Sequence, residues 1–204
     1  LPPVISFDPL FSKSAAAWER TLGTAKLLTA RLSSVTGRSV VDIDMRRAVE
    51  QVNRRRALHS RLARWRAKRA ISGADALAAL NAGLFMDDAS YIGALTGLLQ
   101  GVEQRSAAAG HKKRVLLVSA EPLYHDRMHR LIDAADAVVV SENDDWGSRS
   151  LGDAFDAGAD PMEAVARACY GRGASPRAPR EKRDRWLRAQ MTSRDVDAVV
   201  FYVP

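Results

Sequence analysis

The sequence predicts an α/β fold in which a helical segment precedes a parallel β-sheet. Residues 115–118 (VLLV) and 137–140 (AVVV) are short apolar runs separated by a polar segment of helix length. This pattern is typical of a strand–helix–strand unit whose strands are parallel and covered on both faces. A third apolar run occupies residues 198–203. We therefore predict a helical segment with a short N-terminal strand at residues 1–110 and a parallel α/β domain at residues 111–204.

Length and composition limit the classes of protein that the chain can belong to. It has 204 residues, of which 47% are hydrophobic, as expected for one or two ordinary folded domains. No apolar run reaches the roughly 18 residues of a membrane-spanning helix, so we expect a cytoplasmic protein with no membrane partner. The single cysteine, Cys169, excludes an internal disulfide framework and an all-cysteine metal site built by this chain alone. Strand-like sequence near both ends leads us to expect that the domain is incomplete there.

The formal net charge of +7 comes largely from two arginine-rich segments, residues 46–69 and 172–188. A basic surface suits nucleic acid, membrane headgroups or an anionic ligand such as the phosphates of coenzyme A (CoA). The simpler interpretation, which we favour from sequence alone, is that these arginines lie on solvated helix faces.

Two long helices are predicted in the first third of the chain. Ser14 precedes a run of apolar residues at helical spacing that stops at Gly37. Asp42 or Asp44 is expected to cap the second helix. We expect the two helices to pack antiparallel, with the arginines at 54–56 as a solvated flank.

Four shorter helices are predicted from their starting residues. Residues 72–75 (SGAD) have the spacing of a capping box, and Gly83 ends the helix that follows. Residues 87–88 (DD) start a helix expected to end near residue 110. Residues 160–161 (DP) combine a capping aspartate with proline at the first helical position, and residues 179–180 (PR) start a strongly charged helix.

Polar residues follow both apolar runs of the predicted sheet. Ser119 follows the first run and Glu142 the second. Ligands of parallel sheets bind beyond the carboxyl ends of the strands, so a site is expected there. The carboxylates of Glu142, Asp144 and Asp145 suit a metal or a general base, but capping of a helix near residues 146–149 is the interpretation we favour.

No established catalytic motif is present. The sequence lacks GxGxxG, a Walker loop, GxSxG and HExxH, so it assigns no catalytic residue. His125 and His129 have the i, i+4 spacing of metal ligands on a helix, but we interpret them as solvated positions on a surface helix.

Several motifs, each weak alone, resemble a known family in their order and spacing. Along nearly its whole length the chain is similar to the C-terminal half of subunits of the 2-hydroxyacyl-CoA dehydratase and benzoyl-CoA reductase family. The matching segments are residues 35–38 (VTGR), 44–49 (DMRRAV), 53–56 (NRRR), 71–73 (ISG), 114–117 (RVLL), 138–140 (VVV), 147–149 (GSR) and 195–202 (DVDAVVFY).

This resemblance implies a flavodoxin-like domain in an enzyme, a lyase or a reductase, that dehydrates or reduces an acyl-CoA thioester. It also implies a heterodimer with a homologous subunit, a cysteine-ligated iron–sulphur cluster, and an ATP-dependent activator that supplies an electron for a radical intermediate. The acyl-CoA is expected at the strand ends, in contact with Ser119, Glu142, Ser148 and Arg149. The guanidinium of Arg149 suits a CoA phosphate or a carboxylate.

The chain departs from the family pattern at the cysteines. Residues 144–146 (DDW) and 174–176 (ASP) stand where family members often have cysteine, and Cys169 matches neither position. A cluster needs thiolate ligands, so the chain is either an enzyme subunit whose cluster ligands lie elsewhere or a non-catalytic partner of a cluster-bearing homologue. A basic nucleic-acid-binding protein is a third alternative. We do not expect it, because the arginine-rich segments lack interleaved aromatic residues for base stacking.

Overall fold

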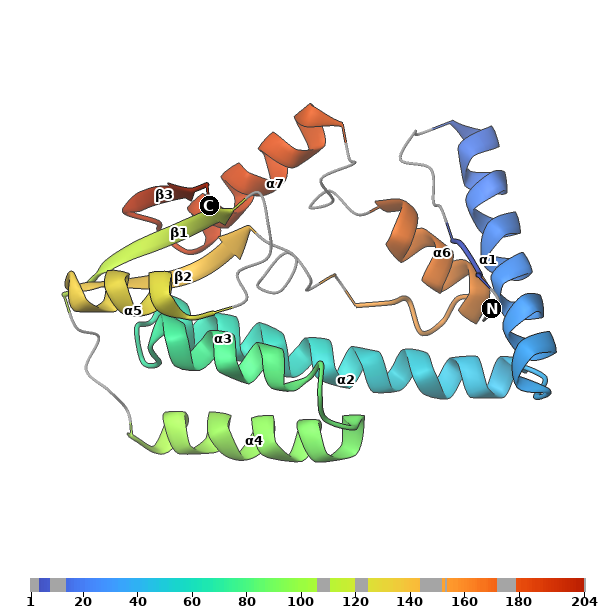
Figure 1. Ribbon diagram of the computed structural model, residues 1–204, viewed down its shortest axis with the longest axis horizontal. Helices are drawn as coiled ribbons and strands as arrows, with labels where there is room; N and C mark the ends of the chain where they lie inside the picture. The colour runs from blue at the N-terminus through green and yellow to red at the C-terminus, as the bar shows by residue number, and fades with distance from the viewer. Residues whose placement is uncertain are drawn as a thin grey trace.

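The computed structural model describes residues 4–7, 14–105, 111–119, 125–143, 152, 154–171 and 179–203. These residues form seven helices and one three-stranded parallel sheet, so the predicted α/β class is confirmed (Figure 1). Residues 4–7 have no regular secondary structure, and the short N-terminal strand predicted there is wrong. No helix in the described part of the chain is both long and apolar enough to cross a bilayer.

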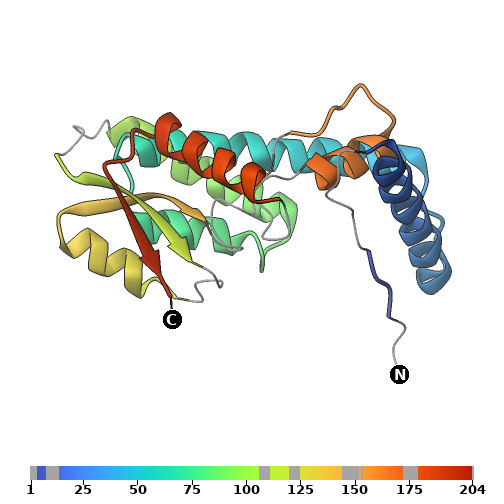
Figure 2. The same cartoon turned by 90° about the horizontal axis from the view of Figure 1, so that it is seen from above.

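Helix α1, Ala15–Thr36, begins and ends as predicted. The Ser14 hydroxyl accepts a hydrogen bond from the Ala17 amide at 3.2 Å, and Gly37 ends the helix with a φ of 67°, which glycine adopts without strain. The predicted antiparallel packing of α1 on the next long helix is wrong. α1 lies across the N-terminal end of the second long helix and packs on α6, Pro161–Gly171 (Figures 1 and 2). Small residues make this possible, because the buried face of α1 consists of Ala17, Thr21 and Ala25.

The core of the helical part forms along α2, Asp42–Ala67, the longest helix. α3, Gly73–Ala82, runs back along α2. After α3 the chain reverses direction again, and α4, Asp88–Arg105, also packs on α2 (Figure 1). Side chains from α2, α3 and α4 fill this core, among them Leu62, Leu80, Tyr91, Leu95 and Leu99. Apolar burial from helices that are adjacent in sequence therefore holds this part together.

Most of the predicted helix starts are seen. The Ser72 hydroxyl accepts from the Asp75 amide at 3.0 Å at the start of α3, and an Asp87 carboxylate oxygen accepts from the Ser90 amide at 3.0 Å at the start of α4. Asp160 caps α6 in the same way. The prediction for α2 is wrong, because Val41 occupies its N-cap position without a side-chain hydrogen bond.

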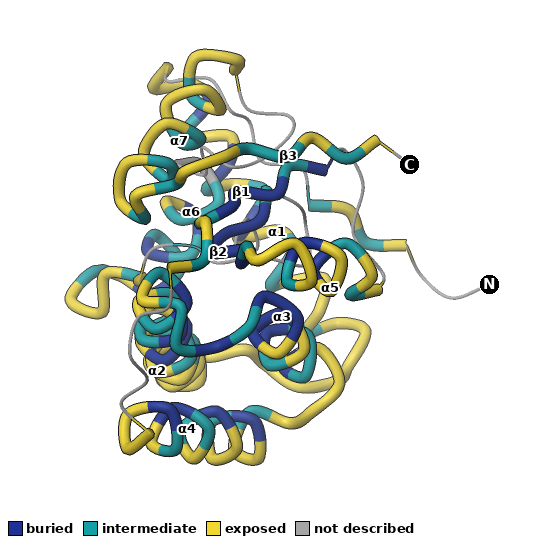
Figure 3. The backbone as a smooth tube through the Cα atoms, turned by 90° about the vertical axis from the view of Figure 1, so that its left-hand side faces the viewer, coloured by how far each residue is buried: buried dark blue, intermediate teal, exposed yellow. Residues whose placement is uncertain are grey.

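The sheet has strand order β2-β1-β3, and all three strands are parallel. The strands are β1, Lys113–Ser119, β2, Ala137–Asn143, and β3, Ala198–Tyr202, with the short helix α5, Arg127–Ala134, between β1 and β2. Figure 3 shows the sheet between α7, Arg180–Ser193, and a second layer formed by α2, α3 and α5. Both faces are covered, so the central strand β1 is buried as its unbroken apolar sequence predicted.

Helix α3 lies so close to β2 that its first residue has to be glycine. A Cβ atom on Gly73 would come within 3.0 Å of the Val139 Cβ and 3.2 Å of the Val139 backbone nitrogen. Gly73→Ala is therefore expected to lower the free energy of unfolding by about 1–3 kcal/mol, measured by urea denaturation.

Gly97 in α4 supplies the matched control for this prediction. A Cβ atom there would meet nothing within 4 Å, so Gly97→Ala is expected to raise the free energy of unfolding by about 0.5–1 kcal/mol. Equal changes in the two variants would show that α3 and β2 do not require this close approach.

Candidate functional site

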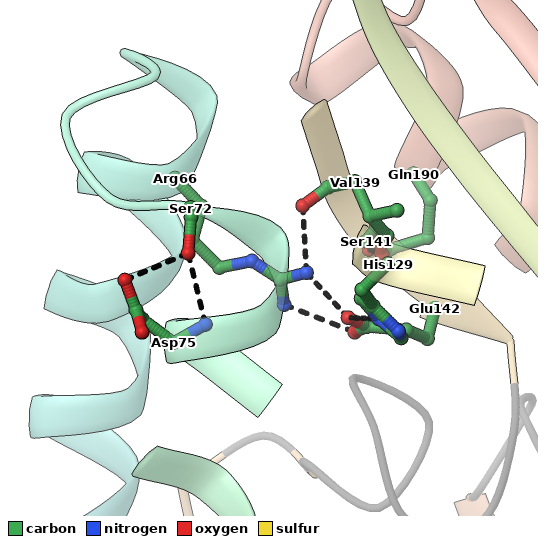
Figure 4. Close-up of polar contacts among 8 residues, drawn as sticks. All are labelled: Arg66, Ser72, Asp75, His129, Val139, Ser141, Glu142 and Gln190. Atoms are coloured by element: carbon green, nitrogen blue, oxygen red, sulfur yellow. Dashed lines mark hydrogen bonds and ion pairs between the residues drawn. The ribbon is translucent and has the colours of Figure 1, made fainter. Parts of the chain in front are cut away.

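The carboxyl end of β2 carries a buried ion pair with a histidine beside it (Figure 4). Arg66 from α2 donates from Nη1 to Glu142 Oε2 at 2.9 Å and from Nη2 to Glu142 Oε1, and the same Nη2 donates to the Val139 carbonyl at 2.7 Å. His129 Nε2 of α5 lies 3.0 Å from Glu142 Oε1. The side chains of Glu142 and His129 are fully buried, and that of Arg66 is 2% exposed. This cluster joins the two helices to the strand.

Glu142 stays ionised inside the protein. Burial by itself raises the pKa of its carboxyl, but the Arg66 guanidinium and the His129 hydrogen bond outweigh burial and hold that pKa well below its usual range. A carboxylate in this state binds Arg66 and His129 firmly. Its first effect is therefore to fix α2 and α5 on β2.

The interpretation of His129 as a solvated surface residue is wrong. α5 packs on β2, and this packing turns His129 inward to Glu142. His125, just before the helix, is exposed as expected. The i, i+4 spacing did not reveal this difference, because α5 begins only at Arg127, so His125 precedes the helix and the spacing does not put the two side chains on one helix face.

Two of the four residues predicted to contact a substrate lie at the expected edge of the sheet. Ser119 is the last residue of β1, and Glu142 pairs in register with Leu117, two residues earlier on that strand. Both are buried, with 3% and 0% of their surface exposed. Ser148 and Arg149 lie outside the described residues, as do Asp144 and Asp145 and the helix cap predicted near them. A substrate-contact role for the four stays a prediction.

A cavity of about 340 Å³, here called the α2–α7 cavity, lies between those two helices. α2 contributes Arg56, His59 and Arg64. α7 contributes Trp186 and Gln190, and Arg194 follows directly after that helix. Arg56, Ser60, Ala63 and Ala67 recur at intervals of three and four along α2. Trp186, Gln190 and Arg194 recur at intervals of four, so the lining residues from each segment share one face. The fold thus brings arginines of the segment 46–69 to the same cavity as Arg194, which lies more than 100 residues later in the sequence.

The segment that precedes α6 holds the Arg56 side chain in place. Its guanidinium lies over the Phe155 ring, 4.0 Å from the ring centroid. Asn53 fixes Phe155 in turn: its Nδ2 donates to the Phe155 carbonyl at 2.9 Å, and its Oδ1 accepts from the Phe155 amide at 2.7 Å. The cation on this wall is therefore oriented before any ligand arrives.

Arg194 on the opposite wall is a half-buried cation that no carboxylate contacts among the described residues. It donates to the side chains of Gln190 and, at 3.3 Å, Ser193, while its buried Nε has no hydrogen-bond partner among the residues that the structure describes. Burial, and after it the positive charge of Arg66, lowers the pKa of Arg194, and Glu142 opposes them. An anion in the cavity would offset the cost of burying this charge.

The cavity adjoins the carboxyl end of β2. Ser141, next to Glu142, donates from its hydroxyl to Gln190 Oε1 at 3.2 Å. Gln190 therefore links the cavity wall to the strand that carries the buried ion pair, as Figure 4 shows. The sheet edge at which a ligand was expected and the arginine-lined cavity are neighbouring parts of one region.

Sequence reasoning missed the α2–α7 cavity, because it assigned the arginines of residues 46–69 to solvated helix faces and did not consider Arg194. The available signal was their spacing, which puts Arg56 and Arg64 on one face of α2 together with His59. Spacing within one helix does not identify the partner face, and that face belongs to α7.

The residues of this chain do not fit an iron–sulphur cluster. Such clusters are held by several thiolates, whereas the sequence has one cysteine, Cys169, half-buried in α6. Within the residues described by the structure, no group of three or more histidine, cysteine, aspartate or glutamate side chains is placed to hold a metal ion.

Comparison with known proteins supports the resemblance noted from the motifs. No curated protein sequence matches the chain. The family model described as 2-hydroxyglutaryl-CoA dehydratase, D-component, matches residues 3–204, which is nearly the whole chain. The chain therefore belongs to the 2-hydroxyglutaryl-CoA dehydratase D-component family.

Proposed function

We propose that the chain is a subunit of a multi-component enzyme that dehydrates or reduces an acyl-CoA thioester, with 2-hydroxyacyl-CoA as the substrate class. The observation that carries the proposal is the match of the family model across residues 3–204. The arginine-lined α2–α7 cavity supports it, because CoA carries several phosphate charges and guanidinium groups suit phosphate.

In this proposal the chain's own residues bind and orient the thioester. Arg56 and Arg194 face the cavity from opposite walls and attract an anion to it. At the carboxyl ends of the strands, the substrate is proposed to contact Ser119, Ser148 and Arg149. Glu142 is proposed to contribute to this site by holding Arg66 and His129 in position.

The one-electron chemistry that the family resemblance implies would need ligands that this chain does not supply. We propose that the cysteines of an iron–sulphur cluster come from outside these 204 residues, from a homologous partner subunit, and that an ATP-dependent activator delivers the electron. The alternative function is a non-catalytic subunit that shapes the interface with such a partner. The presence of only one cysteine in the sequence is equally compatible with this alternative and with an enzyme subunit whose cluster ligands come from a partner.

Thioester binding tests the proposal directly. Isothermal titration calorimetry of the protein, alone and with any homologous subunit that co-purifies with it, is expected to show saturable binding of 2-hydroxyacyl-CoA thioesters. The free 2-hydroxy acid, which lacks the phosphates, is expected to bind at least about tenfold more weakly. If no CoA thioester binds in either preparation, the proposed function is wrong. Thioester binding without turnover by the assembled enzyme would leave the non-catalytic alternative.

A further inference from the structure

We infer that the α2–α7 cavity takes the nucleotide end of the acyl-CoA, its adenosine 3′-phosphate 5′-diphosphate, and leaves the acyl group outside. This inference rests on the proposed function and names the part of the ligand that this chain holds. The cavity size limits the choice. At about 340 Å³ it lies at the lower end of ligand pockets, which run from about 300 to 1,000 Å³. An acyl-CoA joins a nucleotide, a pantetheine arm and an acyl group, so a cavity of this size holds one of the three.

Charge selects the nucleotide end. Three arginines line the cavity, and no carboxylate does so among the described residues. Arg64 is exposed and has no carboxylate within ion-pair distance in the part of the chain that the structure describes. Arg194 is half-buried, and within the described ranges its Nε lacks a hydrogen-bond partner. Phosphate oxygens accept hydrogen bonds from such groups, whereas a pantetheine amide or an acyl chain leaves the charges uncompensated.

Trp186 suits the adenine ring. Its half-buried indole lines the cavity from α7, in the turn before Gln190. A base stacked on an aromatic side chain gains about 1–3 kcal/mol. The apolar residues of the lining are small, Ala63 and Ala67 of α2, and offer little surface for an acyl chain. Stacking and charge therefore favour the same end of the ligand.

The position of the cavity leaves room for the rest of the ligand at the sheet edge. Gln190 connects the cavity wall to Ser141 near the carboxyl end of β2. Ligands of parallel sheets bind beyond this edge. A nucleotide held in the cavity would direct the pantetheine arm and the thioester along it, to a reaction centre shared with a partner subunit.

Binding of adenosine 3′,5′-bisphosphate to the intact protein tests the inference by calorimetry, with an acyl-pantetheine thioester as the nucleotide-free probe. Adenosine 3′,5′-bisphosphate is expected to bind and to compete with the acyl-CoA. Arg64→Gln is expected to weaken both ligands roughly 10- to 100-fold by removing one charge-assisted contact, and Trp186→Leu at least about fivefold. Arg54→Gln is the matched control, because Arg54 is an exposed arginine of α2 outside the cavity lining, and it is expected to change neither affinity.

Each other outcome overturns the inference in a recognisable way. Acyl-CoA binding without binding of adenosine 3′,5′-bisphosphate, or acyl-CoA affinity unchanged in Arg64→Gln, rejects the cavity as the nucleotide site and leaves the proposed function standing. Failure of all CoA compounds to bind rejects both. Equal affinity for sulphate shows a general anion site, and tighter binding of a single-stranded oligonucleotide that displaces the bisphosphate shows a nucleic-acid site. Thermal melts of the variants verify that each is folded.

Discussion

Glu142→Gln is expected to lower the free energy of unfolding by about 3–5 kcal/mol. The substitution keeps the shape of the side chain but removes the charge that Arg66 pairs with, in a cluster with almost no solvent exposure. The guanidinium of Arg66 is then left buried without a counter-charge. Because whole domains are stable by only about 5–15 kcal/mol, this loss is expected to be a large part of the total.

Urea denaturation of the variant and of a matched exposed pair checks this result. Glu103, which pairs with Arg61 at 2.7 Å, is 38% exposed, so Glu103→Gln is expected to cost less than about 1 kcal/mol. Adding Arg66→Met to Glu142→Gln removes the unpaired charge and is expected to recover part of the loss. A Glu142→Gln variant as stable as Glu103→Gln would show that the buried pair does not hold α2 and α5 on the sheet.

Stability is expected to fall between pH 6.5 and pH 4 because of His59. Burial, and after it the nearby charges of Arg55 and Arg56, lowers the pKa of His59 from 6.5 to about 4. The unfolded chain therefore takes up a proton on this residue at a pH where the folded chain does not. The stability that the neutral His59 contributes is complete above pH 6.5, falls by about 2 kcal/mol at pH 5 and by about 3 kcal/mol at pH 4.

The hydrogen bonds of His59 supply the control. Tyr91 donates its single hydroxyl proton to the Ala79 carbonyl at 3.0 Å, so His59 Nε2, 2.8 Å from that hydroxyl, is the donor of the pair. A glutamine amide can make the same donation without titrating. His59→Gln is therefore expected to remove the loss measured by urea denaturation between pH 7 and pH 5. A variant with the same pH dependence as the natural protein would assign the acid sensitivity to other groups.

Glu142 also makes a contribution to stability that is lost in acid, but in a lower pH range. Its pKa is lowered in the folded protein, so its contribution is present above the ordinary carboxyl pKa of about 4.3 and is lost as the pH falls below that value. The loss between pH 6.5 and pH 5 is thus due to the histidine and not to this carboxylate. The two residues can therefore be tested separately in one titration.

The beginnings of most helices could be predicted because each depends on contacts within a few residues. Ser14, Ser72 and Asp160 all accept hydrogen bonds from amides three residues later, and Gly37 supplies the left-handed turn that ends α1. Such signals are complete in the sequence itself. The same holds for β1 and β2, whose apolar runs indicated burial on both faces, whereas no residue of β3 is buried.

The candidate site could be predicted only in part. The rule that ligands bind beyond the carboxyl ends of parallel strands placed Ser119 and Glu142 at one edge, and the structure has both there. The same reasoning gave no partner for Glu142, because Arg66 lies 76 positions earlier in the chain. It also gave no reason to bring Arg56 and Arg194 to one cavity.

By itself, then, the sequence determined where the strands and most of the helices lie, that the sheet is parallel, and to which family the chain is similar. Only the tertiary structure decided that α1 packs on α6, that His129 turns inward to a buried ion pair, and that α2 and α7 enclose an arginine-lined cavity. The physical reason is the separation in sequence between the residues that interact. Caps and periodicity are fixed by neighbours a few residues away, whereas the partner of a helix face depends on which other surfaces can cover it at close packing density.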